Sequence, residues 1–182
     1  MAKIIRWGIT DGYRLAQTVG KELRDPSRYT PEEFFAAAER ALKKHPNEWV
    51  IYYSLADKYQ SAGYYAEALE ATQKCVEIKP YDLRSVYALA TSYNLITRAA
   101  WSDKEHEVLK LLQMLSGPEV GEVDRRFSQI ALDRTGLAIE TAAAQAIRWF
   151  ERALTLNPDG QSRAQIQWDL ETLYKRFPHL KR

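Results

Sequence analysis

Apolar side chains recur three and four positions apart along much of the chain, which is the spacing of one face of an α-helix. The pattern is strongest over residues 47–80, where two amphipathic runs flank a turn at Ser61-Ala62-Gly63. It recurs near the C-terminus, where the apolar positions are Ile166, Leu170, Leu173, Tyr174 and Phe177. The hydrophobic pattern therefore predicts a protein that is mostly helix.

Residues that start and stop helices mark the boundaries of these runs. Thr30 and Glu33 have the spacing of a capping box with Pro31 in the first turn, and they predict a helix that ends near Lys44. Asp82 is expected to cap a further helix. Other helices are expected over about residues 11–23, 48–61, 65–78, 102–115 and 162–177.

Small residues and prolines recur at a fixed spacing. A small residue lies five positions before a proline at Ala41 and Pro46, at Cys75 and Pro80, and at Ala153 and Pro158. Pro46 to Pro80 is 34 residues, and Pro80 to Pro158 is 78, which equals two such steps plus ten extra residues. Small side chains let neighbouring helices approach closely, and each proline stops a helix. A repeated helix pair with a period near 34 residues is therefore expected.

The segment 47–80 also carries a motif of helical repeats, W-x2-L-G-x2-Y followed by A-x3-F and P. The matching positions are Tyr52, Leu55, Ala56, Tyr59, Ala68 and Pro80, with Thr72 where an aromatic residue is usual. Further along, Val86-x2-Leu89-Ala90-x2-Tyr93 matches the first half, and Ala146-x3-Phe150-x2-Ala153-x4-Pro158 matches the second. On these residues the chain resembles the tetratricopeptide repeat family.

The resemblance implies a single all-α domain over residues 1–182. Its expected form is a right-handed α-solenoid of antiparallel helix pairs, with about nine helices. The expected parts are a loosely ordered N-terminus at 1–8, repeats at about 13–46, 47–80, 83–118 and 119–158, and a capping helix at about 161–177.

Composition narrows the class of protein further. The single Cys75 excludes an internal disulfide framework and favours a reducing compartment, so we expect a cytoplasmic protein. No apolar run approaches a membrane span, and a net charge of +2 argues against a dedicated nucleic-acid protein. The three histidines lack metal-ligand spacing, and no catalytic motif is present. We therefore expect neither a cofactor, nor a metal, nor enzyme activity.

The resemblance also implies that the first helix of each pair lines a concave groove. Positions two, five, nine and twelve of those helices would face a ligand there. They are Val50, Tyr53, Asp57, Gln60, Arg84, Tyr87, Thr91, Asn94, Arg125 and Ser128. Arg125 and Ser128 come from the weaker register of the flanking units, which adds Arg14, Gln17, Lys21, Arg24, Leu132 and Thr135. The whole set holds five basic residues and one acidic residue. Tyr and Arg are favoured in binding surfaces, and the basic excess favours an acidic partner.

These observations predict a non-catalytic protein–protein interaction module or adaptor that holds a protein or peptide segment in its groove. Two alternatives stay open. One is a structural subunit that associates with itself or assembles a complex, which the aromatic residues Trp7, Trp101, Trp149 and Trp168 favour. The other is a secretion-type chaperone that holds its client in the groove.

Overall fold

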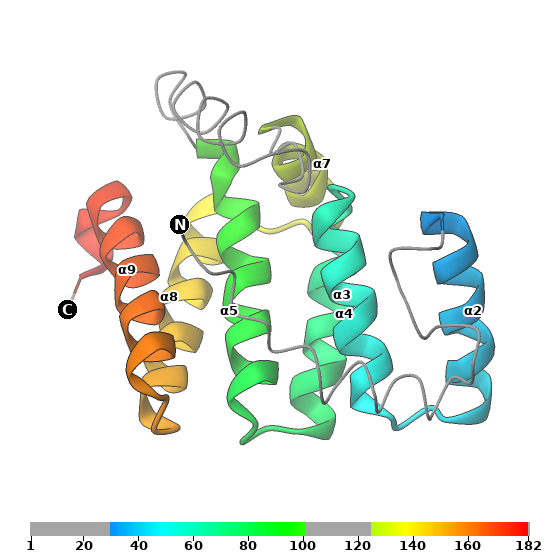
Figure 1. Ribbon diagram of the computed structural model, residues 1–182. Helices are drawn as coiled ribbons and strands as arrows, with labels where there is room; N and C mark the ends of the chain where they lie inside the picture. Colours follow the sequence, from blue (N-terminus) through cyan, green and yellow to red (C-terminus); the bar gives the residue numbers. More distant parts are fainter. Residues whose placement is uncertain (1–29, 101–124, 182) are drawn as a thin grey trace.

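The computed structural model describes residues 30–100 and 125–181, and these two stretches form seven α-helices and no β-strand (Figure 1). The helices are α2 (Pro31–Lys44), α3 (Trp49–Ser61), α4 (Tyr65–Ile78), α5 (Leu83–Ile96), α7 (Arg125–Thr135), α8 (Ile139–Thr155) and α9 (Gly160–Arg176). Two short 3-10 helices, η3 (Thr97–Ala100) and η4 (Pro178–Leu180), follow α5 and α9. The predicted all-helical class is confirmed for this part of the chain. The N-terminus at 1–8 and the helices expected over 11–23 and 102–115 lie outside it.

Side chains at the N-termini hold three of these helices in place. At α2, the Thr30 hydroxyl accepts from the Glu33 amide at 3.3 Å, and Glu33 Oε2 accepts from the Thr30 amide at 2.9 Å. Asp82 caps α5, and Asp159 caps α9 by accepting from the Ser162 amide at 2.7 Å. Each cap satisfies amides that have no partner inside the helix. The predicted capping box and the predicted cap at Asp82 are both confirmed.

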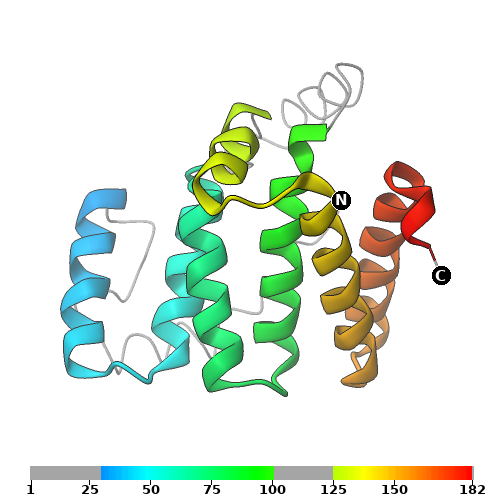
Figure 2. The ribbon, with the colours of Figure 1, turned by 180° about the vertical axis from the view of Figure 1, so that it is seen from behind.

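The helices lie side by side in the order α2, α3, α4, α5, α8 and α9, and successive neighbours run antiparallel (Figures 1 and 2). Helix α7 departs from this row and crosses the ends of α4 and α5 (Figure 1). Among the described helices, α5 makes its most extensive contact with α8, not with α7. The units expected at 83–118 and 119–158 place α5 and α8 in different repeats, whereas here they pack as a pair.

Among the described residues, the buried apolar side chains form two clusters, and α4 contributes to both. One cluster holds side chains of α4, α5, α7, α8 and α9, and the other holds side chains of α2 and α3 with Ala71 of α4. Ala41, Cys75 and Ala153, the small residues before the prolines, are all buried. Their size lets the helix backbones approach, as the repeated spacing predicts. This packing leaves one side of α3, α5 and α9 to carry the polar and aromatic residues of the candidate site.

Candidate functional site

Aromatic and charged side chains from the starts of α3 and α5 meet at one end of the helix row. The rings of Trp49 and Tyr53 are in edge-to-face contact, with their centroids 5.9 Å apart. The Arg84 guanidinium lies over the Trp49 ring, 4.7 Å from its centroid, in cation–π contact. Trp49 is buried, so it is a fixed support for both neighbours.

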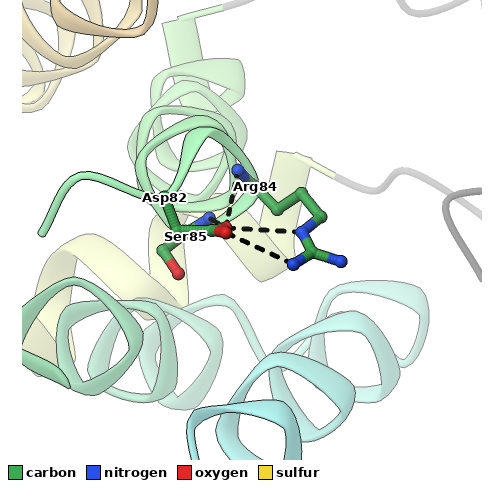
Figure 3. Close-up of polar contacts among 3 residues, drawn as sticks. All are labelled: Asp82, Arg84 and Ser85. Atoms are coloured by element: carbon green, nitrogen blue, oxygen red, sulfur yellow. Dashed lines mark hydrogen bonds and ion pairs between the residues drawn. The ribbon is translucent and has the colours of Figure 1, made fainter. Parts of the chain in front are cut away.

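Asp82 fixes the position of Arg84 while it caps α5 (Figure 3). Its Oδ1 accepts from the backbone amides of Arg84 at 3.0 Å and Ser85 at 3.2 Å. The same carboxylate accepts from the Arg84 guanidinium, at 3.4 Å from Nε to Oδ1 and 3.2 Å from Nη2 to Oδ2. Asp82 and Trp49 therefore hold Arg84 in one orientation, and its side chain stays 22% exposed.

A hydrogen bond joins α5 to α9 across this surface. The Tyr87 hydroxyl donates to Asp169 Oδ2 at 3.0 Å, and the Gln165 side-chain amide donates to the same oxygen at 3.4 Å. Burial raises the pKa of Tyr87 well above its usual range, and the neighbouring Asp169 raises it further. Burial also raises the pKa of Asp169, although the bond from Tyr87 opposes this shift. Tyr87 thus stays a protonated donor.

Helix α3 contributes Asp57 and Gln60 to the same surface. The Gln60 side-chain amide donates to the Ser92 hydroxyl of α5 at 3.0 Å. The Asp57 side chain is exposed, yet desolvation by the surrounding protein raises the pKa of its carboxyl group. We call this surface the α3–α5–α9 face and define it by Tyr53, Asp57, Gln60, Arg84, Tyr87 and Asp169.

The remaining predicted groove residues fall in different places. Val50 is 1% exposed and Ser128 is fully buried, with its hydroxyl donating to the Leu95 carbonyl at 2.9 Å. These two side chains lie in the core and do not line a surface. Thr91 and Asn94 are half-buried on α5, and the Thr97 hydroxyl donates to the Asn94 carbonyl at 2.7 Å.

Four of the predicted basic residues lie outside the side chains that the structure describes. Arg125 is the first residue of α7. Arg14, Lys21 and Arg24 belong to residues 1–29, which lie outside the described stretches. Of the five basic residues predicted for the groove, Arg84 is the one whose side chain the structure describes, and the basic excess stays a prediction.

Sequence reasoning missed Asp169. The last helix is predicted as a capping helix, and polar residues of a capping helix usually face water. Asp169, however, is only 7% exposed and faces Tyr87. The signal was its position three residues after Ile166 and next to Leu170, both of them buried. A carboxylate inside an apolar stripe needs a buried hydrogen-bond partner, because its desolvation is otherwise costly.

The described side chains show no arrangement for metal or thiol chemistry. Within these residues, no group of three or more His, Cys, Asp or Glu could hold a metal ion. Cys75 is fully buried, and burial raises the pKa of its thiol to about 12, with Asp82 adding to the shift. A thiol of that kind is a poor nucleophile.

The fold and this face define an all-helical protein whose antiparallel helix hairpins support a polar and aromatic surface. Residues 50–82 match the model of the tetratricopeptide repeat family. The predicted resemblance to this family is confirmed for that segment. Repeats of this family generally act as protein–protein interaction modules. A search of curated proteins found no significant match. None of the described helices is long and apolar enough to cross a membrane.

Proposed function

We propose that this protein is a non-catalytic interaction module and that its α3–α5–α9 face binds a segment of a protein partner. In this proposal the helix pairs stack as a right-handed solenoid, with the α3–α5–α9 face on its concave side. The family match at residues 50–82 supports it, because α3 lies in that segment and contributes Tyr53, Asp57 and Gln60 to the surface. The lone buried thiol of Cys75 fits a reducing compartment such as the cytoplasm.

The observation that carries the proposal is the fixed Trp49–Arg84 pair beside Tyr53. Arg84 is oriented by Asp82, so little side-chain entropy is lost when a ligand pairs with it. A guanidinium suits a carboxylate, and a tyrosine ring supplies contact area. We therefore propose a partner segment with an acidic residue near an apolar one.

Comparative affinity capture tests the proposal. The baits are the wild type and a double variant that carries both Tyr53→Ala and Arg84→Ala. Tyr87 is left unchanged, because its bond to Asp169 supports the fold. Trp168→Ala is the matched control, since this aromatic side chain is 62% exposed on α9 and lies outside the face as defined. We expect a partner that the wild type and the control retain and the double variant loses. A purified partner that binds the double variant as tightly as wild type would refute the assignment.

A second candidate function is self-association through the outer side of α9. The observation that favours it is the exposed Trp168 side chain on this helix. Exposed aromatic side chains are common where a subunit contacts a second copy of itself. Sedimentation of the wild type and of Trp168→Ala over a range of concentrations tests it. A wild type that stays monomeric at the highest concentration contradicts this candidate.

A further inference from the structure

A hollow lies between α3 and α4, away from the α3–α5–α9 face. It is a pocket of about 430 Å³, and its α4 wall includes Glu67, Glu70, Ala71, Lys74 and Glu77. These positions recur every three or four residues, so they form one face of α4. None of them belongs to the α3–α5–α9 face.

Carboxylates outnumber cations around this pocket. Its α4 wall carries Glu67, Glu70 and Glu77, against the one lining cation Lys74. Lys74 Nζ is paired with Glu77 Oε2 at 2.6 Å, and Glu67 pairs with Arg134 of α7. Glu70 lies between these two pairs and is exposed. With both ion pairs counted, the charge of Glu70 is left uncompensated among these residues, and a positively charged ligand could pair with it.

Aromatic rings form the opposite wall, and both are held in place. The Tyr59 ring stacks on Phe35 of α2, with centroids 4.6 Å apart. The Tyr52 hydroxyl donates to the Pro46 carbonyl at 3.1 Å. Burial raises the pKa of Tyr59, and carboxylates of α4 and α2 raise it further, namely Glu67, Glu39 and Glu70. The ring thus already lies in the field of several negative charges.

The pocket also has an apolar part. Leu55 and Ala71 line it, and both are buried side chains of the core that joins α2 and α3. A simple ion would gain nothing from such a surface. Lysine and arginine side chains combine a charged head with an apolar stem, and the stem packs well on aliphatic and aromatic walls.

We propose that this pocket binds a lysine or arginine side chain presented by a segment of a partner protein. The charged head lies among Glu67, Glu70 and Glu77, and the stem packs on Leu55 between the two tyrosine rings. This site has the opposite charge preference to that of Arg84 on the α3–α5–α9 face. It does not depend on the function proposed for that face, and its test uses different residues.

The test is a nuclear magnetic resonance titration of the isotope-labelled 182-residue chain at constant ionic strength. The probes are N-acetyl-arginine methylamide, N-acetyl-lysine methylamide, N-acetyl-glutamate methylamide and methylammonium chloride. We expect the two basic amino-acid probes to cause saturable shifts of the amides of Glu70, Ala71 and Lys74. The acidic probe should leave these amides unshifted. Methylammonium should bind far more weakly, because it has a charge and no stem.

Variants identify the residue responsible. Glu70→Gln keeps the shape of the side chain and removes its charge, so we expect about threefold weaker binding of the arginine probe. Glu171→Gln, on the exposed side of α9, is the matched control and should bind as wild type does. The proposal is overturned if no saturable shift occurs at the pocket, if Glu70→Gln binds equally well, or if methylammonium shifts the same amides as strongly.

Discussion

At the scale of single residues, the burial of the Asp169 carboxyl group beside Tyr87 makes stability depend on pH. Asp169 is faced by Tyr87 of α5, by Gln165 of its own helix and by Arg98 of η3, and burial still raises its pKa in the folded state. A raised carboxyl pKa means that the folded state holds the proton more tightly than the unfolded state does. The stability it contributes is complete below the ordinary carboxyl pKa and is lost as the pH rises through the folded value.

The variant Asp169→Asn removes this titration and keeps an acceptor for Tyr87. We expect wild type to gain stability relative to the variant as the pH falls from about 7 to about 4. Urea unfolding at the two pH values measures the difference. Glu171→Gln on the same helix is the control. A difference between wild type and Asp169→Asn that does not change with pH would contradict the prediction.

Asp82 combines two roles that a pair of variants can separate. Asp82→Ala removes the cap of α5 and the anchor of Arg84, and should destabilise the protein by about 1–2 kcal/mol. Asp82→Asn keeps an oxygen that can cap the helix, so we expect a loss of only a few tenths of a kcal/mol. Thermal unfolding followed by circular dichroism measures both. Equal losses would mean that the ion pair matters more than the cap.

Cys75 gives a direct probe of burial, because it is the only cysteine of the chain. The pKa of about 12 leaves almost no thiolate near neutral pH, and the side chain is fully buried. We expect Ellman's reagent to leave the native protein unmodified and to react rapidly after unfolding in guanidinium. Native protein that reacts at the unfolded rate would show that the α3–α4 hairpin opens freely.

At the scale of helices, the contact of α7 with the α3–α4 turn depends on a glycine. Gly63 has a φ of +81°, and a Cβ there would lie 2.6 Å from the Phe127 ring. Gly136 also has a positive φ, of +66°, but no atom lies within 4 Å of such a Cβ. The two positions share the backbone strain and differ in the steric contact.

We therefore expect Gly136→Ala to cost about 1–2 kcal/mol from backbone strain alone, and Gly63→Ala to cost more. In a Phe127→Ala background the extra cost at Gly63 should disappear, since the ring is absent. Urea unfolding of the single and double variants measures these differences. If Gly63→Ala and Gly136→Ala lose the same stability, the Phe127 ring of α7 does not pack against the α3–α4 turn at Gly63.

Local chemistry made the helices predictable, but not the position of α7. The capping box at Thr30 and Glu33 needs only four consecutive residues, and Asp82 caps the amides directly after it. Helix α7 lies against α4 through contacts between residues far apart in the sequence, such as Phe127 with Tyr65 and Arg134 with Glu67. No periodicity within α7 encodes these partners. The same limit applies to Asp169, whose partner Tyr87 lies 82 positions away.

At the scale of the whole molecule, the packing of α5 on α8 suggests a different division into repeats. The motif in α5 matches the first half of a repeat, and the motif in α8 matches the second. The Arg152 guanidinium of α8 donates to the Pro80 carbonyl just before α5, at 2.9 Å. The 78 residues between Pro80 and Pro158 then equal one step of 34 plus 44 inserted residues. The proline spacing alone could not distinguish one repeat with 44 inserted residues from two repeats with ten inserted residues.

Two deletion variants distinguish a repeat formed by α5 and α8 from separate repeats at 83–118 and 119–158. The first variant lacks residues 97–140, and a copy of the turn Ala62-Gly63-Tyr64 connects α5 to α8 in their place. The second variant lacks residues 83–118. If α5 and α8 form one repeat, the first chain should unfold cooperatively, with a lower midpoint because α7 is absent. The second chain should lose cooperative unfolding, because α8 then has no α5 to pack on. Urea unfolding followed by circular dichroism measures both, and the opposite result would restore the boundary between 118 and 119.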